Sequence, residues 1–310
     1  DRGVARVGVG PGEHERAGTL SVSSIANRSS ASSIGAPTTV PNGTISIGSA
    51  TSAGTLRYTG GAASTNRIIN LAGTTGGATL DSSGTGALTF TSAFTATGAG
   101  AKTLTLTGTT SGNTISGAIV DNSSTNKTSL TKSGAGSWIL SGVNTYTGIT
   151  TISAGTLTLG ATGTIANSTT INLGTTASTG TLDLTAKSAF TFGSTQTVSG
   201  VGTINIGSGK TLTVAGGFAP GNSTGIVNVT GNLTFSGTTL TTMEISGAGG
   251  VAGTDFDQIN VSGIFTTGGT LNITSLGGFT PTAGYSFQLF GSLTSIGGSF
   301  STINLIGFGS

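Results

Sequence analysis

The chain has 310 residues, of which 11 are Lys or Arg and 9 are Asp or Glu, so only 6% carry a charge. In an ordinary soluble domain about 25% of the residues are charged. No run approaches the roughly 18 consecutive apolar residues of a membrane-spanning helix. Disordered chains combine low hydrophobicity with high net charge, whereas here 34% of residues are hydrophobic and the net charge is +2. The composition argues against a membrane span, disorder and a nucleic-acid partner, and it favours a packed protein.

The chain contains no cysteine. Disulfides and thiolate metal sites are therefore excluded, and the fold does not depend on a redox compartment. The sequence starts at Asp1 rather than Met and shows no signal peptide. We expect a processed, exported product, with a cloned fragment as the alternative.

The first 40 residues differ in composition from the rest. They hold seven of the twenty charges (11 + 9), and Pro37 and Pro41 mark a linker. Their alternating apolar residues, Leu20, Val22 and Ile25, suit a strand that adds to an exposed sheet edge. We expect residues 1–40 to form an extended N-terminal arm or linker, with a disordered leader as the alternative.

From residue 41 onward the apolar residues recur with period two, as in "TLTLTG" (Thr103–Gly108) and "GTLDLTA" (Gly180–Ala186). Alternation of this kind predicts strands. Gly supplies 56 residues and Thr is abundant; both are poor helix formers, and Thr suits strands. The sequence therefore predicts an all-β protein, and we expect no capping helix at either end.

A short unit, G-T-[LI]-x-[LIV], recurs along the chain. It begins at Gly43, Gly155, Gly180, Gly202 and Gly269. From Leu157 to Leu182 to Ile204 the spacing is 25 and then 22 residues, which is typical of solenoid repeats. One unit cannot bury its own apolar residues, but stacked units can. We expect residues 41–310 to form a parallel β-helix, or β-solenoid, of roughly a dozen coils.

The stretch "GAGSWILSGVNTYTGITTISAGTLTLG" (Gly134–Gly160) shows how a coil turns. One parity holds the residues that define the pattern: Gly134, Gly136, Trp138, Leu140, Gly142, Asn144, Tyr146, Gly148, Thr150 and Ile152. After "SAG" the apolar residues move to Leu157 and Leu159, on the other parity. A change of one residue turns the inward face around a corner, where glycine can adopt positive φ.

The segment from Leu130 to Gly160 resembles the autotransporter-associated β-strand repeat, a passenger-type family of bacterial surface proteins. The repeat-defining positions are Lys132, Gly134, Gly136, Trp138, Leu140, Gly142, Asn144, Tyr146, Gly148, Gly155 and Leu157. The resemblance covers about a tenth of the chain. It implies a right-handed parallel β-helix that is extracellular or displayed on the bacterial surface.

Possible catalytic and metal sites are weakly supported. "GNSTG" (Gly221–Gly225) matches a nucleophile elbow, but that motif needs a helix and a histidine base, so Ser223 is read as a turn residue. The "EHE" run at Glu13–Glu15 is read as a charged tail rather than a metal site. Asp255 and Asp257 would share one face of a strand about 7 Å apart, within the range of glycosidase carboxylates, but a rung corner or a backbone-bonding turn is favoured.

Three binding interpretations also remain secondary. "GGVAGTD" (Gly249–Asp255) approaches a calcium-binding nonapeptide but has an extra residue and no tandem copies. Trp138 and Tyr146 could form a ligand platform, although stacking inside the coil is favoured. Alternating threonines could order water, yet their spacing from rung to rung looks irregular. We expect no catalytic, metal or cofactor-binding residue and no cofactor.

The sequence therefore predicts a non-enzymatic extracellular structural protein that assembles end to end with itself into a surface fibre or layer. A glycan-binding adhesin module is the alternative, and a polysaccharide-degrading enzyme is a weaker one. Open solenoid ends expose unpaired strand edges, so residues 285–308 are expected to receive the N-terminal arm of the next subunit. The residues expected at this contact are Leu20, Val22, Ile25, Phe287, Leu289, Phe300, Ile303 and Leu305.

Overall fold

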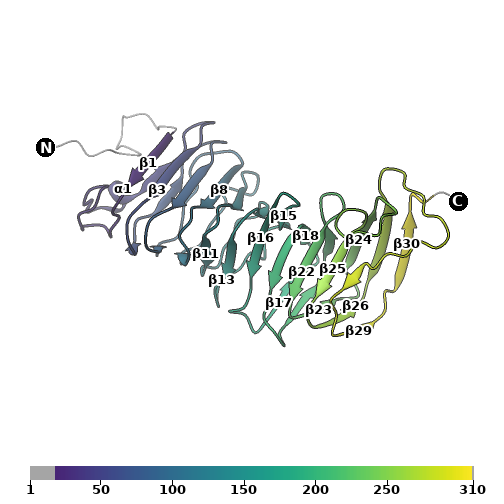
Figure 1. The fold of residues 1–310 in the computed structure, drawn as a ribbon. Helices are drawn as coiled ribbons and strands as arrows, with labels where there is room; N and C mark the ends of the chain where they lie inside the picture. Colours follow the sequence, from purple (N-terminus) through teal and green to yellow (C-terminus); the bar gives the residue numbers. More distant parts are fainter. Residues whose placement is uncertain (1–17, 309–310) are drawn as a thin grey trace. The chain divides into compact units, whose positions relative to one another are not determined.

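The structure, a computed structural model, describes residues 18–308 of the chain. These residues divide into two compact units. Unit 1 holds the described residues up to Thr150 together with Gly155–Ser168, and unit 2 holds Thr151–Ala154 together with those from Thr169 onward. In each unit the strands stack in parallel, one above the next (Figure 1). Strand β12 (Thr150–Ile152) contains the boundary in sequence.

The first sheet of unit 1 is a parallel ladder whose neighbours come from successive coils. Its inward column runs in register from Leu20 to Leu56, Leu80 and Leu106. The last three of these leucines are at most 1% exposed. Stacking at about 4.8 Å buries each leucine between its neighbours. The strands are β1 (Gly18–Val22), β3 (Gly54–Tyr58), β6 (Ala78–Ser82), β8 (Lys102–Thr107) and β10 (Thr128–Lys132).

A second parallel sheet of unit 1 faces the same interior and contributes the aromatic core. Trp138 lies in register between Asn113 and Leu157. The strands of this sheet are β4 (Ala63–Thr65), β7 (Leu88–Phe90), β9 (Asn113–Ile115), β11 (Ser137–Leu140) and β13 (Thr156–Leu159). A third, two-stranded sheet pairs β2 (Ile45–Ile47) with β5 (Ile69–Leu71).

Unit 1 also contains a short helix at the end of the predicted N-terminal linker. Helix α1 spans Val40–Gly43; the Thr39 side chain caps it by accepting from the Asn42 amide, and Pro41 lies in its first turn. The buried Arg67 holds this segment, because its Nε donates to the Gly43 carbonyl and its guanidinium also reaches Ile34. The expectation of no capping helix concerned the ends of the coil, whereas α1 lies between β1 and β2 in the chain. The helix is a single capped turn of four residues, which is too short to produce a helical periodicity in the sequence.

Unit 2 has three parallel sheets, so each coil has three faces. The first contains β14 (Thr170–Asn172), β18 (Thr197–Gly200), β21 (Gly217–Pro220), β24 (Leu240–Ile245), β27 (Thr270–Ser275) and β30 (Thr302–Ile306). The second contains β16 (Ser178–Asp183), β19 (Gly202–Asn205), β22 (Ile226–Thr230), β25 (Gln258–Val261) and β28 (Phe290–Gly291), and β15 (Gly174–Thr175) pairs antiparallel with β16. The third contains β17 (Ala189–Phe192), β20 (Thr211–Val214), β23 (Asn232–Phe235), β26 (Ile264–Thr267) and β29 (Ser295–Gly298).

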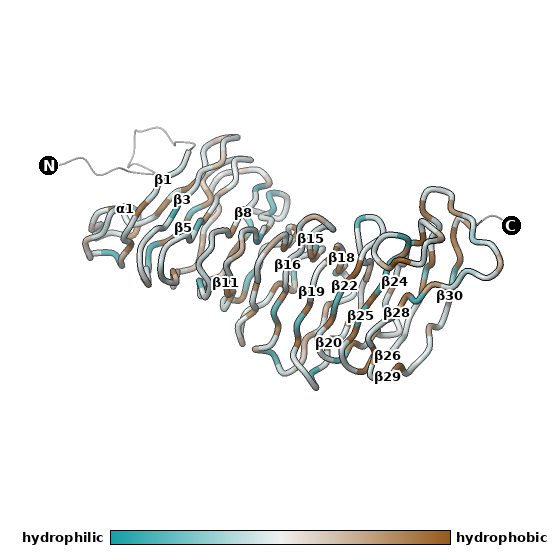
Figure 2. The backbone as a smooth tube through the Cα atoms, in the orientation of Figure 1, coloured by the Kyte–Doolittle hydropathy of each residue, from teal (hydrophilic) through white to brown (hydrophobic). Residues whose placement is uncertain are grey.

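Period-two patterning fills both interiors. Along β20, β23 and β26 the inward column consists of Leu212, Leu233 and Phe265, which are in register and fully buried. Outward positions on the same strands include threonines, such as Thr213 paired with Thr234. Figure 2 shows the result as hydrophobic segments recurring on successive strands. The predicted all-β fold and the parallel β-helix are confirmed.

The two terminal coils differ in how far they bury their inward columns. Strand β1 lies within the range expected as an arm, yet it pairs in register with β3 of its own unit, and Val22 and Ile25 are at most 5% exposed. In β30, by contrast, Ile303 and Leu305 are 60% and 69% exposed. The part of the expected arm formed by residues 1–17 lies outside the described residues.

Candidate functional site

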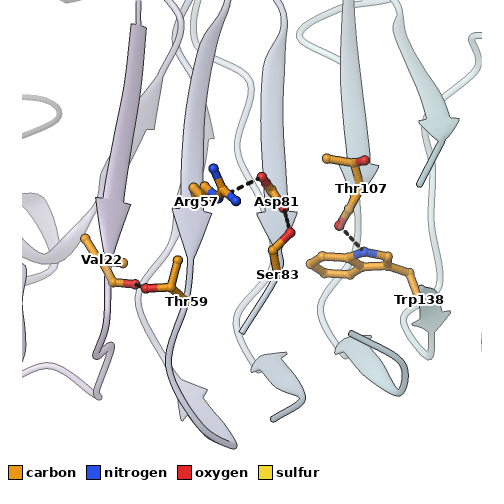
Figure 3. Close-up of polar contacts among 7 residues, drawn as sticks. All are labelled: Val22, Arg57, Thr59, Asp81, Ser83, Thr107 and Trp138. Atoms are coloured by element: carbon orange, nitrogen blue, oxygen red, sulfur yellow. Dashed lines mark hydrogen bonds and ion pairs between the residues drawn. The ribbon is translucent and has the colours of Figure 1, made fainter. Parts of the chain in front are cut away.

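The aromatic residues of the repeat segment lie inside unit 1. Trp138 is fully buried, and its ring stacks on Phe90 with 6.4 Å between centroids and 10° between planes. Its indole N–H donates to the Thr107 carbonyl at 3.1 Å (Figure 3). Tyr146 is 1% exposed. The inward placement expected from parity is confirmed, and neither ring offers a face to a ligand.

Lys132 closes the corner after β10. It is paired with Leu106 of β8, so it occupies the inward column, and it is fully buried. Its Nζ donates to the carbonyl oxygens of Ser133 at 2.6 Å and Gly134 at 2.8 Å. Burial lowers the pKa of Lys132 to about 8, because a low-dielectric surrounding disfavours the charged form. The lysine ammonium thus donates hydrogen bonds to two carbonyl groups at the corner, which lie beyond the end of the strand.

Gly155 explains why the repeat needs glycine close to this lysine. Its φ is +62°, in the left-handed region. A Cβ built there would lie 2.5 Å from the Gly134 oxygen and 2.8 Å from Lys132 Nζ. Other repeat glycines also leave no room for a Cβ, because carbonyl groups of the preceding coil lie close to them; these glycines are Gly136, Gly142 and Gly148. Leu140 and Leu157 fill the interior.

Asn144 and Tyr146 provide the polar part of the repeat. Asn144 accepts from the Ile119 amide at 2.9 Å and donates to the Thr164 carbonyl at 3.0 Å, so one buried amide joins the coils on both sides. The Tyr146 hydroxyl lies 2.7 Å from Thr150, within a buried chain of hydroxyl groups. Burial raises the pKa of Tyr146 and keeps the phenol neutral. The polar groups of Asn144 and Tyr146 are therefore used in hydrogen bonds that hold neighbouring coils together.

The acidic pair of unit 2 also bonds to backbone. Asp257 is fully buried, and its two carboxylate oxygens accept from the amides of Gly225 and Glu244, both at 2.7 Å. Asp255 accepts from the Val251 amide at 2.8 Å. Burial, opposed by these two hydrogen bonds, raises the pKa of Asp257 to about 7, and the nearby Glu244 adds to the rise. Asp257 thus lies at a corner before β25 and Asp255 in a turn, and both bond to backbone amides as expected.

The remaining sequence motifs fall on turns. Ser223 is exposed in the loop between β21 and β22. Asp255, the acid of the calcium-like stretch, is turned onto its own loop, and within residues 18–308 no group of three His, Cys, Asp or Glu side chains is placed to hold a metal ion. The Glu13–Glu15 run lies outside the described residues.

The residues expected to mediate assembly are divided by the structure. Val22 and Ile25 are buried in the first coil of unit 1, and Leu20 is half-buried there. In unit 2, Phe287, Leu289 and Phe300 are half-buried, whereas Ile303 and Leu305 are the exposed members described above. The structure brings Leu20, Val22 and Ile25 onto their own chain rather than leaving them for a neighbour.

Sequence reasoning missed a cluster of aromatic side chains in unit 2. Phe279, Tyr285 and Phe287 lie within 6.5 Å of one another between ring centroids, and Phe287 meets Phe256 at 5.6 Å. Tyr285 is 45% exposed. The signal available in the sequence was the density of aromatic residues between 256 and 300. In the structure Tyr285 stands apart, because the other tyrosines and the tryptophan are at most 3% exposed.

Comparison with known proteins identifies the repeat. Residues 130–159 match the family described as passenger-associated-transport-repeat. This segment is therefore similar to one copy of that repeat. The matched residues include the Lys132 corner, Trp138 and Tyr146, so the family pattern coincides with the buried groups described above. The expected resemblance is confirmed.

A curated relative supports the same assignment. The Adhesin BmaC autotransporter of Brucella suis biovar 1 (strain 1330) is 41% identical over 132 residues, which is 41% of this chain and 4% of the relative. The chain thus corresponds to a small part of that much longer protein. No solved structure matches the chain. Within the described residues, no helix has the length and apolar character needed to cross a membrane.

Proposed function

We propose that this chain is a non-enzymatic passenger segment of a bacterial surface adhesin, located on the cell surface or outside the cell. The observation that carries the proposal is the match of residues 130–159 to the passenger repeat, most of which lies in the coils of unit 1. The relative named as an adhesin adds support. In this role the coils form the scaffold, and adhesion belongs to groups exposed on it.

Several contacts support a scaffold rather than an enzyme. The best catalytic pair, Asp255 and Asp257, has its oxygens on backbone amides. Trp138 and Tyr146 face inward and pack in the interior of the coil. Small hydroxyl side chains such as Thr213 and Thr234 cover outward strand positions, which keeps a β-helix hydrated with little charge.

Adhesion by the purified chain tests the proposal. Fluorescent beads coated with the 310-residue protein are incubated with cultured epithelial cells and washed, alongside beads coated with albumin. We expect retention of the protein-coated beads well above the albumin level. Equal retention of both kinds of bead contradicts the adhesin role.

A second assay separates the adhesin from an enzyme. The protein is incubated with a panel of polysaccharides, and reducing ends are measured. We expect no release of reducing ends. Release by the native chain that Asp257→Asn abolishes overturns the non-enzymatic assignment.

End-to-end assembly is a second candidate function, favoured by one observation. In the last coil of unit 2, Ile303 pairs with Leu271, which is 4% exposed, yet Ile303 itself is 60% exposed. Among residues 18–308, β30 has a ladder partner on one side, β27, and an uncharged strand with one free edge and exposed apolar residues is a template for further pairing. The burial of Val22 and Ile25 within their own unit leaves this edge as the stronger half of the expected contact.

Sedimentation velocity tests the assembly. The native chain is expected to form concentration-dependent oligomers, and Ile303→Lys combined with Leu305→Lys is expected to yield monomers, because charge on an edge strand opposes pairing. The outward-facing Val143→Lys serves as a control on another exposed apolar residue. A monomeric native chain, or oligomers that persist in the double variant, contradicts assembly through β30.

A further inference from the structure

The aromatic cluster of unit 2, defined as Phe279, Tyr285 and Phe287, stands in the loop between β27 and β28. Its inner member is Phe287, which meets Phe256 edge to face at 5.6 Å, and Phe256 is only 3% exposed. Its outer member is Tyr285, which is 45% exposed and lies 6.2 Å from Phe279. The cluster is thus anchored in the coil at one side and open to solvent at the other.

The loop that carries the cluster has defined internal contacts. The Ser275 hydroxyl donates to the Phe279 carbonyl at 2.6 Å, and the Tyr285 amide donates to the Thr282 carbonyl at 3.3 Å. The Tyr285 hydroxyl has no hydrogen-bond partner among residues 18–308. Exposed polar side chains lie beside the cluster in sequence, namely Thr280, Thr282 and Gln288. The aromatic residues are therefore flanked in the sequence by exposed, uncharged hydrogen-bonding residues.

Charge narrows the kind of partner. Residues 211–310 contain no Lys or Arg, and their acidic residues are Glu244, Asp255 and Asp257. Anionic glycans, phospholipid headgroups and nucleic acids need basic residues for attraction. The stretch that carries the aromatic cluster lacks them. An uncharged partner fits the surface best.

A neutral pyranose offers the matching chemistry. Its axial C–H groups form an apolar face that can lie on an aromatic ring, and its hydroxyl groups bond to amides and hydroxyls at the rim. Sites that bind small polar ligands combine a few exposed aromatic anchors with a few polar groups in this way. We infer that the aromatic cluster is a binding surface for uncharged glycans, with Tyr285 as the ring on which a sugar stacks.

This inference rests on the proposed adhesin function and assigns its contact residues. The first test screens the complete 310-residue chain on an array that holds neutral and sialylated glycans. We expect binding to neutral glycans and not to their sialylated counterparts. The strongest neutral oligosaccharide is then titrated by isothermal calorimetry against the native chain and three variants.

The variants separate the ring from its hydroxyl and from general surface effects. Tyr285→Ala is expected to weaken binding at least about tenfold, since it removes an exposed aromatic anchor. Tyr285→Phe keeps the ring and is expected to lose less than Tyr285→Ala. Val143→Ala removes an apolar side chain that is 63% exposed in unit 1, and it is expected to bind like the native chain.

Saturation-transfer NMR on the native chain gives a readout that does not depend on any variant folding. The other two tyrosines, Tyr58 and Tyr146, are at most 3% exposed. Irradiation of tyrosine ring protons is therefore expected to transfer magnetisation to the sugar C–H protons through Tyr285. An array with no neutral glycan bound, unchanged affinity in Tyr285→Ala, or no transfer to the sugar overturns the inference.

The bead assay distinguishes failure of this site from failure of the adhesin role. Beads that adhere equally with native protein and Tyr285→Ala show that adhesion stands and that the aromatic cluster is not its contact surface. Beads that do not adhere, together with a tenfold loss of sugar affinity in Tyr285→Ala, show a glycan site on a protein that is not an adhesin.

Discussion

In unit 1 a buried ammonium, that of Lys132, lies against the carbonyl oxygens of Ser133 and Gly134. In unit 2 a buried carboxylate, that of Asp257, lies against the amides of Gly225 and Glu244. Both groups are fully buried at points where the chain leaves or enters a strand. The cation satisfies backbone carbonyl groups that lie outside the strand ladder, and the anion satisfies backbone amide groups in the same situation.

The comparison teaches that a chain with very few charges can place them at the junctions of its coils rather than only on its surface. Such groups are held at a cost, because burial disfavours the charged form of each. The pKa of Lys132 is lowered to about 8 and that of Asp257 is raised to about 7. The two units are therefore expected to respond to pH in opposite directions.

The largest expected effect is the pH dependence of unit 2. The Asp257 pKa is raised from 3.8 to about 7, so the folded state holds this proton more tightly than the unfolded state. The resulting stabilisation is complete below about pH 4 and is lost as pH rises through about 7. At about 1.4 kcal/mol for each tenfold change in the ionisation equilibrium, the loss amounts to roughly 4 kcal/mol.

Hydrogen exchange measured by mass spectrometry can resolve this effect locally. We expect protection of peptides containing β24 and β25 to fall as pH rises from 4 to 7, after correction for intrinsic exchange rates. Asp257→Asn is expected to remove the dependence, since the amide does not titrate. Peptides of β3 and β6 in unit 1 serve as the internal control. A native chain with flat protection in this window contradicts the prediction.

The second effect concerns unit 1 and runs the other way. The pKa of Lys132 is lowered from 10.5 to about 8, so its contribution to stability is present above about pH 10.5 and is lost as pH falls through about 8. The difference is roughly 3 kcal/mol. Lys132→Met keeps a similar volume without a titrating group.

Fluorescence of Trp138, the one tryptophan of the chain, reports on unit 1 during urea unfolding. Between pH 8 and 10, the free energy of unfolding of the native chain is expected to rise relative to that of Lys132→Met. Parallel curves for the two proteins in this range would mean that the lysine is held without a change in its ionisation.

The smallest effect tests the packing beside the lysine. Gly155 and Gly277 have nearly the same backbone angle, with φ of +62° and +64°. Around Gly155 a Cβ would meet Lys132 Nζ at 2.8 Å, whereas around Gly277 nothing lies within 4 Å. Gly277→Ala is expected to cost about 1 kcal/mol through backbone strain alone. Gly155→Ala is expected to cost about 2 kcal/mol more, because a packed corner must shift.

Urea unfolding of both variants, followed by Trp138 fluorescence for Gly155→Ala and by circular dichroism for Gly277→Ala, measures the difference. Equal costs at the two glycines would show that the Lys132 corner relaxes freely. A larger cost at Gly277 would contradict the close packing of the corner.

The sequence by itself determined the fold class and the inward faces. Alternation with period two requires strands, and glycine-rich corners at similar intervals require stacked coils, so the parallel β-helix follows from local pattern. The same parity predicts that Trp138, Leu140 and Tyr146 point inward, as they do. The motif around Lys132 could be read as a family repeat, but not as a corner in which the lysine meets carbonyl groups.

Tertiary structure alone decided which residues meet between coils. The hydrogen bonds of buried polar groups to neighbouring coils span 20 residues at Asn144, 25 at Asn113 and 32 at Asp257. Because loop lengths vary, the residue stacked above a given position does not follow from the period. For this reason the two amide partners of Asp257 and the meeting of Phe256 with Phe287 could not be predicted. Local pattern fixes the face on which a side chain lies, and coil length fixes its neighbours.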